Sequence, residues 1–333
     1  MHLEGALSPS LLFTLASRNN IPLPSPQTDP SFTSTSTLLE RYDQFTSLDD
    51  FLHYYFIGMS CLVVAQDFED LAWEYFKTAR SQNVMHAEVF FDPQAHTARG
   101  IKYETVVEGF GKACRRAETE LGMSTRMILC FLRHLPVEDA KATWEHTLGD
   151  FENGTLAGIG LDSSEKGFPP EEWRDIYADA KVRGIQRTAH AGEEGPVEYI
   201  KQALRVCDVQ RIDHGIKLAD DEELMKEVAE RKILVTMCPL SNLKLQCVQK
   251  VDQLPVRKFL DHRVQFSINS DDPAYFTSYI QDNYCAVQDA FDLQADDWSY
   301  IGKAAVVGSW IDEPRKAQLL QMIDRAINDH HGQ

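Results

Sequence analysis

The sequence has few of the features that mark membrane or secreted proteins. It contains no run of about 18 apolar residues, which a transmembrane helix requires. Its start shows no basic stretch followed by an apolar one, so no secretory signal is predicted. The seven cysteines include no CxxC pair, and their odd number argues against a disulfide framework. These absences predict a cytoplasmic location, with the nucleus as an alternative.

Positive charge is also scarce. The chain has 33 Lys and Arg residues against 51 Asp and Glu residues, which gives a formal net charge of −18. Such a surface repels the phosphates of nucleic acids and of anionic lipids, so neither is expected as a partner. A small neutral or cationic molecule suits this charge better, and the sequence leaves the oligomeric state open.

What the sequence does have is an alternation of short apolar runs with longer amphipathic segments. The apolar runs predict seven strands, at residues 84–91, 125–131, 156–161, 186–191, 211–214, 233–237 and 264–268. The amphipathic segments predict helices at residues 7–18, 48–58, 66–81, 103–121, 136–148, 170–183, 196–206 and 220–231. A helical tail is predicted at 279–327, broken near Pro314, and a Pro/Ser/Thr-rich loop at 22–37.

Strands that alternate with helices predict a mainly parallel sheet. A chain of 333 residues, 43% of them hydrophobic and without a break in composition, is typical of one α/β barrel domain over residues 1–333. We therefore expect a (β/α)₈ TIM-type barrel with extra helices at both ends. A closed barrel needs eight strands, so the first strand is expected to be largely missing.

Histidines and carboxylates follow three of the predicted strands. His190 and Glu193 end one strand, His214 ends the next, and Asp271 and Asp272 follow the last. Each group alone has an ordinary explanation: a helix N-terminus, a structural histidine or an exposed turn. In a barrel, however, the carboxyl ends of the strands share one face, where active sites lie.

A fourth polar residue, His2, stands at the start of the chain. Together with His190 and Asp271 it supplies imidazole and carboxylate groups, which suit Zn²⁺. Zinc with an open position lowers the pKa of its water to about 7, and a nearby glutamate such as Glu193 can carry protons. The set predicts metal-assisted hydrolysis.

Several blocks of this chain resemble the adenosine and adenine deaminases among the metal-dependent amidohydrolase barrels, especially the adenine deaminases of fungi and bacteria. In order along nearly the whole chain, these blocks are His2-Leu3-Glu4-Gly5, Phe90-Phe91-Asp92-Pro93-Gln94, Gly160-Leu161-Asp162-Ser163-Ser164-Glu165, His190-Ala191-Gly192-Glu193, Asp213-His214-Gly215, Cys238-Pro239-Leu240-Ser241-Asn242 and Ser270-Asp271-Asp272-Pro273.

The resemblance implies hydrolytic deamination of a purine at C6, with release of ammonia, and a role in purine salvage. It implies one Zn²⁺ per chain, held by His2, His190 and Asp271. It further assigns the remaining site residues: Glu193 protonates N1, His214 orients or deprotonates the water, Asp272 hydrogen-bonds N7, and the backbone at Ser163 and Ser164 faces the N3 edge. Protonation of N1 requires a neutral carboxyl, which burial favours.

Adenine is the expected substrate because adenosine-type members carry Leu-Ala-Gly-Asp-Glu where this chain has residues 162–165. The segments 90–94 and 96–100 also resemble the adenine group. The alternatives are adenosine, a nucleotide, an N6-substituted adenine, or another ring amide or imine.

The chain departs from the family at its start. The family's first metal motif is His-x-His, and here Met1 stands at the middle position, so the first histidine is absent. We expect the natural protein to start upstream. A genuine short form would have one ligand fewer and hold zinc more weakly. The alternative function is then that of a catalytically impaired paralogue, which binds purine without turnover.

Overall fold

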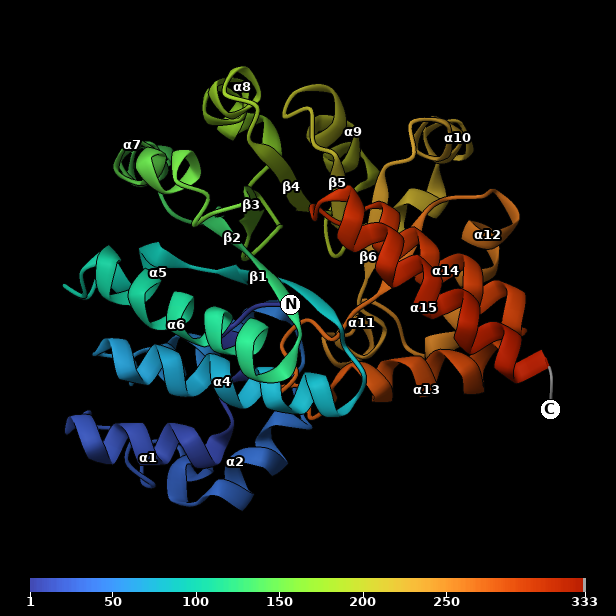
Figure 1. Ribbon diagram of the computed structural model, residues 1–333. Coiled ribbons are helices and arrows are strands. Elements are labelled where there is room, and N and C mark those ends of the chain that lie inside the picture. The colour runs from blue at the N-terminus through green and yellow to red at the C-terminus, as the bar shows by residue number, and fades with distance from the viewer. Residues whose placement is uncertain (332–333) are drawn as a thin grey trace.

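The computed structural model describes residues 1–331 and has a curved parallel sheet at its centre, with helices around its outside (Figure 1). The strands lie side by side in chain order: β1 (His86–Phe91), β2 (Ser124–Leu132), β3 (Gly158–Asp162), β4 (Gln186–Ala191), β5 (Arg211–His214), β6 (Leu234–Met237) and β7 (Phe266–Ile268). All seven predicted strands are present, within two residues of their predicted ends. The prediction of an α/β TIM-type barrel wall is confirmed.

The start of the chain lies between the two outer strands of this wall. The backbone N–H of Phe90 in β1 donates to the Met1 carbonyl at 2.8 Å, and Leu3 donates back to Phe90 at 2.9 Å. On the other side, His2 donates to the carbonyl of Asp271, just after β7, at 3.1 Å. Residues 1–3 thus occupy the end of the remaining strand position, and within residues 1–331 no further strand fills the rest of it.

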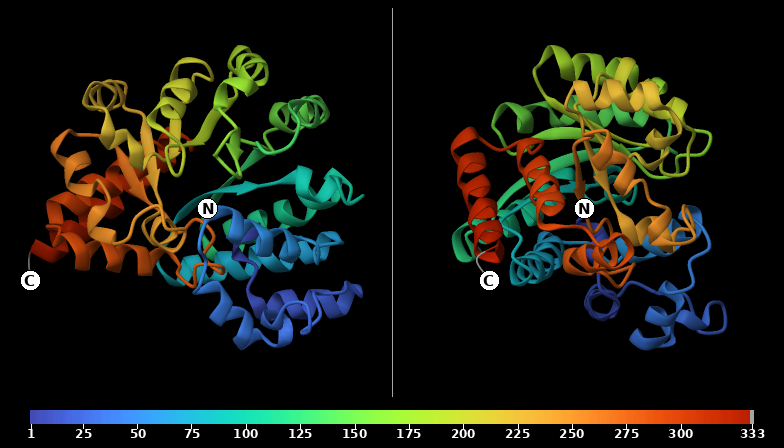
Figure 2. Two further views of the ribbon diagram at one scale, coloured as in Figure 1. Left: turned by 180° about the vertical axis from the view of Figure 1, so that it is seen from behind. Right: turned by 90° about the vertical axis from the view of Figure 1, so that its right-hand side faces the viewer.

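Helices precede, separate and follow the strands (Figure 2). Their bounds are α1 (Pro9–Asn19), α2 (Thr35–Tyr42), α3 (Leu48–Met59), α4 (Ala65–Ser81), α5 (Pro93–Thr97), α6 (Tyr103–Leu121), α7 (Val137–Glu152), α8 (Arg174–Val182), α9 (Val197–Arg205), α10 (Glu222–Glu230), α11 (Pro239–Lys244), α12 (Val256–Asp261), α13 (Ile280–Phe291), α14 (Ala295–Val307) and α15 (Glu313–His331). None of the helices among residues 1–331 is both long and apolar enough to cross a membrane.

Two predictions about these helices were wrong in part. The expected loop at 22–37 contains the first turn of α2, because Ser34 caps that helix and Thr37 completes a capping box. The tail breaks after α13, where Asp292 is left-handed, and again between α14 and α15. This second break lies near Pro314, as predicted, and Pro314 itself stands in the first turn of α15, where proline is tolerated. The break after α13 was not predicted.

The interior at the amino ends of the strands is closed by a buried ion pair. Glu88 of β1 and Arg211 of β5 belong to strands that are not neighbours, so they meet inside the curve of the sheet. Burial alone would raise the pKa of Glu88, but Arg211 and His86 lower it to about 2. The Arg211 guanidinium also lies 4.2 Å from the centre of the Trp310 ring. The open end of the interior is therefore the carboxyl end.

Candidate active site

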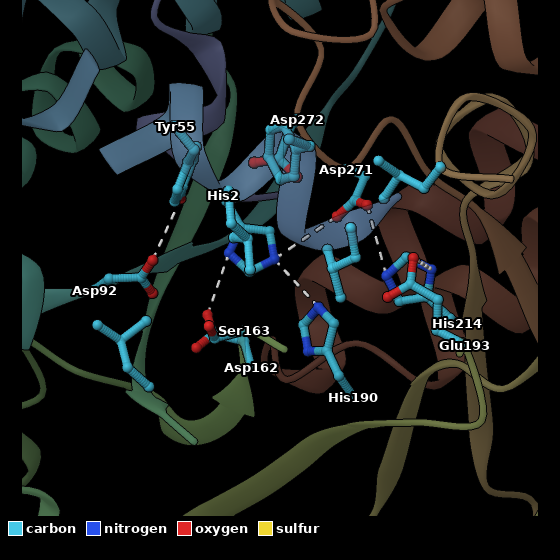
Figure 3. A pocket seen from close by; sticks show the side chains of 15 residues that line it. His2, Tyr55, Asp92, Asp162, Ser163, His190, Glu193, His214, Asp271 and Asp272 are labelled. Atoms are coloured by element: carbon cyan, nitrogen blue, oxygen red, sulfur yellow. Dashed lines mark hydrogen bonds and ion pairs between the residues drawn. The ribbon is translucent and has the colours of Figure 1, made fainter. Parts of the chain in front are cut away.

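A cavity lies at the carboxyl ends of the strands (Figure 3). The space between its lining atoms, including open solvent at its mouth, is about 410 Å³. The polar residues that line it are His2, Tyr55, Asp92, Asp162, Ser163, His190, Glu193, His214, Asp271 and Asp272, and the apolar ones are Leu48, Phe51, Leu52, Leu132 and Leu245. Every predicted site residue except Ser164 is among them.

Three of these residues have a left-handed backbone, which is uncommon for residues other than glycine. The φ angles are 73° at Ser163, 60° at His214 and 57° at Asp271. Each follows or ends a strand, so the left-handed turn redirects the chain just where its side chain enters the cavity. Such backbone outliers gather at functional sites, where the surrounding structure holds them in place.

His2, His190 and Asp271 converge, as the sequence predicts for a metal site. The two Nε2 atoms lie 3.2 Å apart, and Nε2 of His2 lies 3.6 Å from Oδ1 of Asp271. One donor atom from each residue falls within 4.8 Å of the others.

The second nitrogen of each imidazole decides what these Nε2 atoms can do. Nδ1 of His190 lies 3.1 Å from the Leu161 carbonyl, which can only accept, so Nδ1 carries the proton. Nδ1 of His2 lies 3.4 Å from the Asp162 carboxylate, which favours a proton there as well. Both Nε2 atoms then present lone pairs to each other and to a carboxylate. A cation among them relieves this repulsion, and outer partners of this kind commonly orient metal-bound histidines.

Both imidazoles are also held in the neutral form that binds metals. Burial, followed by His190, lowers the pKa of His2 well below its ordinary value. Burial, followed by His214, lowers the pKa of His190 to about 3. The residues present therefore fit a divalent cation with an imidazole and carboxylate donor set.

Glu193 and His214 form a buried pair beside this donor set. Nδ1 of His214 lies 3.5 Å from Oε1 of Glu193, and its Nε2 lies 3.5 Å from Oδ2 of Asp271. Burial raises the pKa of Glu193 to about 8, although His214 opposes the shift. Burial alone would lower the pKa of His214, but Glu193 and Asp271 raise it. The pair can thus hold and exchange a proton near neutral pH.

Asp272 and Ser163 line the same cavity from opposite loops. Burial and Asp271 raise the pKa of Asp272 well above its ordinary range, and its Oδ1 has no hydrogen-bond partner. Gly5 packs against this carboxylate so closely that any Cβ there would collide with it. The Ser163 hydroxyl lies 2.7 Å from Nδ1 of His134.

The strongest support for the Glu193 loop comes from Glu165, to which the sequence analysis assigned no role. The Glu165 side chain is buried, and it accepts four backbone N–H hydrogen bonds of 2.6 to 3.0 Å, from residues 192–195. Its only sequence signal was its place in the Gly160–Glu165 block. Asn242 of α11 lies 3.1 Å from Nδ1 of His214 and had a similar signal, its place in the Cys238–Asn242 block. Arg133 donates to the His190 carbonyl at 2.8 Å and had no sequence signal.

Replacing Glu165 with glutamine is expected to destabilise the fold. Glutamine keeps one acceptor oxygen and turns an NH₂ group toward N–H donors, so at least one charge-assisted bond is lost and a donor is left unpaired. We expect the free energy of unfolding to fall by about 2–4 kcal/mol, measured by chemical denaturation.

Glu194→Gln is the matched control for this variant. The Glu194 side chain is 8% exposed, but it pairs at 3.1 Å with Lys166, which is 65% exposed, so solvent screens the pair and the change should lower stability by about 1 kcal/mol or less. Equal stability of Glu165→Gln and wild type would contradict a supporting role for Glu165.

Two further carboxylates in the cavity were also without a predicted role. Asp92 follows β1 and Asp162 ends β3, and each is 2% exposed. Burial and Glu4 raise the pKa of Asp92 to about 7, and burial and Asp92 raise that of Asp162 well above its ordinary range. Oδ1 of Asp92 and both carboxylate oxygens of Asp162 have no hydrogen-bond partner.

Comparison with known proteins agrees with this geometry. The chain is 56% identical to an adenine deaminase from Aspergillus fumigatus over 99% of this chain and 94% of that protein. The structure matches that of an adenine deaminase from Arthrobacter aurescens at 37% identity, with a TM-score of 0.93 and coverage of 98% and 97%. It also matches an amidohydrolase from Burkholderia ambifaria with bound Zn, at 26% identity and a TM-score of 0.85, over 99% and 91% of the chains.

The family model for adenosine deaminase matches residues 1–326, which is nearly the whole chain. It includes each of the predicted metal, proton-transfer and substrate residues. The chain therefore belongs to the adenosine deaminase family and is an aminohydrolase.

Proposed function

We propose that this protein converts adenine and water to hypoxanthine and ammonia, with one Zn²⁺ per chain. The observation that carries the proposal is the convergence of two imidazole lone pairs and a carboxylate beside the buried Glu193–His214 pair. Relatives named adenine deaminase, at 56% and 37% identity, support adenine as the substrate. The reaction fits purine salvage in the cytoplasm.

His2, His190 and Asp271 would hold the zinc ion. When bound, the ion supplies Lewis-acid activation of a water molecule. The structure of the Burkholderia relative with bound Zn supports this choice of metal. Nδ1 contacts to Leu161 and Asp162 fix the two histidine rings, so their Nε2 atoms are oriented before any ligand arrives.

Glu193 and His214 would manage the protons. Because burial raises its pKa to about 8, the Glu193 carboxyl is protonated at neutral pH and can give its proton to N1 of the ring. Loss of ring electron density makes C6 open to attack by water. His214, in contact with Glu193 and Asp271, is placed to orient that water and to take its proton.

Asp272, Ser163 and the apolar wall would position the ring. Burial and Asp271 favour the neutral form of the Asp272 carboxyl, and a neutral carboxyl can donate a hydrogen bond to N7, which only accepts. Ser163 lines the cavity where the N3 edge is expected. Leu48, Phe51 and Leu52 of α3 cover the cavity with apolar side chains, which limits competing bulk water.

The test is a direct assay of the purified, zinc-loaded protein. Adenine, adenosine and N6-methyladenine are supplied separately, ultraviolet absorbance reports ring conversion, and ammonia is measured in parallel. We expect one zinc per chain by atomic emission and conversion of adenine to hypoxanthine with one ammonia per ring. Failure of the zinc-loaded protein to convert adenine would overturn the proposal, and faster turnover of adenosine would overturn the choice of substrate.

A further inference from the structure

Asp92 is a buried carboxylate that no structural role accounts for. It precedes α5 at the N-cap position, where an Asp side chain usually accepts a hydrogen bond from the first turn, yet it makes no such bond. Oδ2 accepts one long hydrogen bond, from the Tyr55 hydroxyl at 3.3 Å. Oδ1 receives no hydrogen bond of good geometry from any described residue, although Asp92 is only 2% exposed, lines the cavity and lies beside the Asp162 carboxyl. A buried acceptor of this kind is unfavourable until a donor reaches it.

A second cation is one candidate for that donor, because Asp92, Asp162 and His2 lie close enough to share one. The histidine argues against it. If Nε2 of His2 serves the site with His190 and Asp271, its Nδ1 carries the proton and faces Asp162 at 3.4 Å. A protonated nitrogen cannot bind a metal. The Asp162 carboxyl, whose raised pKa favours its protonated form, already interacts with Asp92, so the second donor that Asp92 can take up is an N–H group of a ligand in the cavity.

The position of Asp92 indicates which N–H group arrives. Figure 3 shows Asp92 and Tyr55 on one side of His2, and Asp271, His214 and Glu193 on the other. In a purine, N9 lies across the ring system from C6. With C6 at the side of the predicted metal donors, the N9 edge points away from them, toward the side where Asp92 lies. Free adenine carries a hydrogen on its imidazole ring, whereas a nucleoside has a sugar on N9 and no hydrogen there.

We propose that Asp92 accepts the N9–H hydrogen bond of free adenine and so selects the free base over purines substituted at N9. This inference rests on the proposed deamination of adenine and deepens it. Tyr55 holds Oδ2, which leaves Oδ1 as the acceptor for the ligand. A substituent on N9 removes the donor and leaves a buried carboxylate unpaired, and sites of this type discriminate strongly against such analogues.

The test compares kcat/KM for adenine and 9-methyladenine in wild type and in Asp92→Ala. In wild type we expect adenine to be preferred by about 10³-fold or more. In the variant, kcat/KM for adenine should fall about 10- to 100-fold, which corresponds to loss of one charge-assisted hydrogen bond. The rate on 9-methyladenine should not fall, because the variant removes the unpaired acceptor and opens space, so the preference should drop to about 100-fold or less.

Glu4→Gln is the matched control. Glu4 is also a buried carboxylate, and it accepts the backbone N–H of Asp92 at 3.0 Å, but it does not line the cavity. It should not reduce the preference, because it leaves the Asp92 carboxyl in place and removes a neighbouring negative charge that raises the Asp92 pKa. Asp92→Asn is the fallback if the alanine variant fails to fold, because asparagine has nearly the same shape as aspartate. The asparagine oxygen is a weaker, neutral acceptor, so the preference for adenine should still fall by about tenfold. Zinc content should equal that of wild type throughout.

The outcomes separate the two proposals. A wild-type protein that does not convert adenine overturns both. If the wild type converts adenine but the preference of Asp92→Ala stays within about threefold of the wild-type preference, the role of Asp92 is overturned and the proposed deamination stands.

Discussion

Replacing His190 with alanine is expected to remove bound zinc and to lower turnover of adenine by about 10⁴-fold or more. The Nε2 atom of His190 faces His2 at 3.2 Å, and its loss leaves one imidazole and one carboxylate for the ion. Two protein donors do not hold zinc tightly, because protein zinc sites use at least three. The measurement is zinc per chain by atomic emission after dialysis, together with the rate of adenine conversion.

His146→Ala is the control for this variant. His146 of α7 is more than half exposed, pairs with the exposed Glu104 and does not line the cavity. Its replacement should leave zinc content and rate unchanged. Zinc at one per chain in His190→Ala would remove His190 from the proposed ligand set, whatever happens to the rate.

The barrel wall could be predicted from sequence because its signals are local. Most strands coincide with a short apolar run, and most are followed by an amphipathic segment, so the alternation is visible without any tertiary contact. The convergence of polar side chains on the cavity could be predicted because of where they stand along the chain. His190, His214 and Asp271 end or follow strands, and the carboxyl ends of parallel strands meet.

The supporting residues could not be predicted in this way. Glu165 acts through the backbone N–H groups of residues 192–195, and nothing in its own neighbourhood shows that these will turn toward it. Asp92 looks like an ordinary helix cap before Pro93, and only its failure to cap α5 sets it apart. The first turn of α2 was missed because serine and threonine favour both loops and helix caps.

Replacing Glu193 with glutamine is expected to keep zinc but to lower kcat by about 10³-fold, within the range that a positioned general acid contributes. Glutamine has nearly the same shape, so the loop held by Glu165 should be preserved. Its amide can hydrogen-bond to N1 but cannot transfer a proton to it. KM for adenine should therefore change little while kcat falls, which is the pattern of an interaction needed only in the transition state.

Glu194→Gln again supplies the comparison, because Glu194 is the next residue, carries the same group and pairs with Lys166 instead of lining the cavity. It should retain kcat within about twofold, since an ion pair with an exposed partner contributes little.

A structural effect of Glu193→Gln would raise KM or reduce zinc content along with kcat, so the three measurements separate loss of proton transfer from disruption of the site. If kcat of Glu193→Gln stayed within about tenfold of wild type, protonation of N1 would have to come from another group. The remaining candidate in contact with Glu193 is His214, whose raised pKa makes it the next proton donor to test.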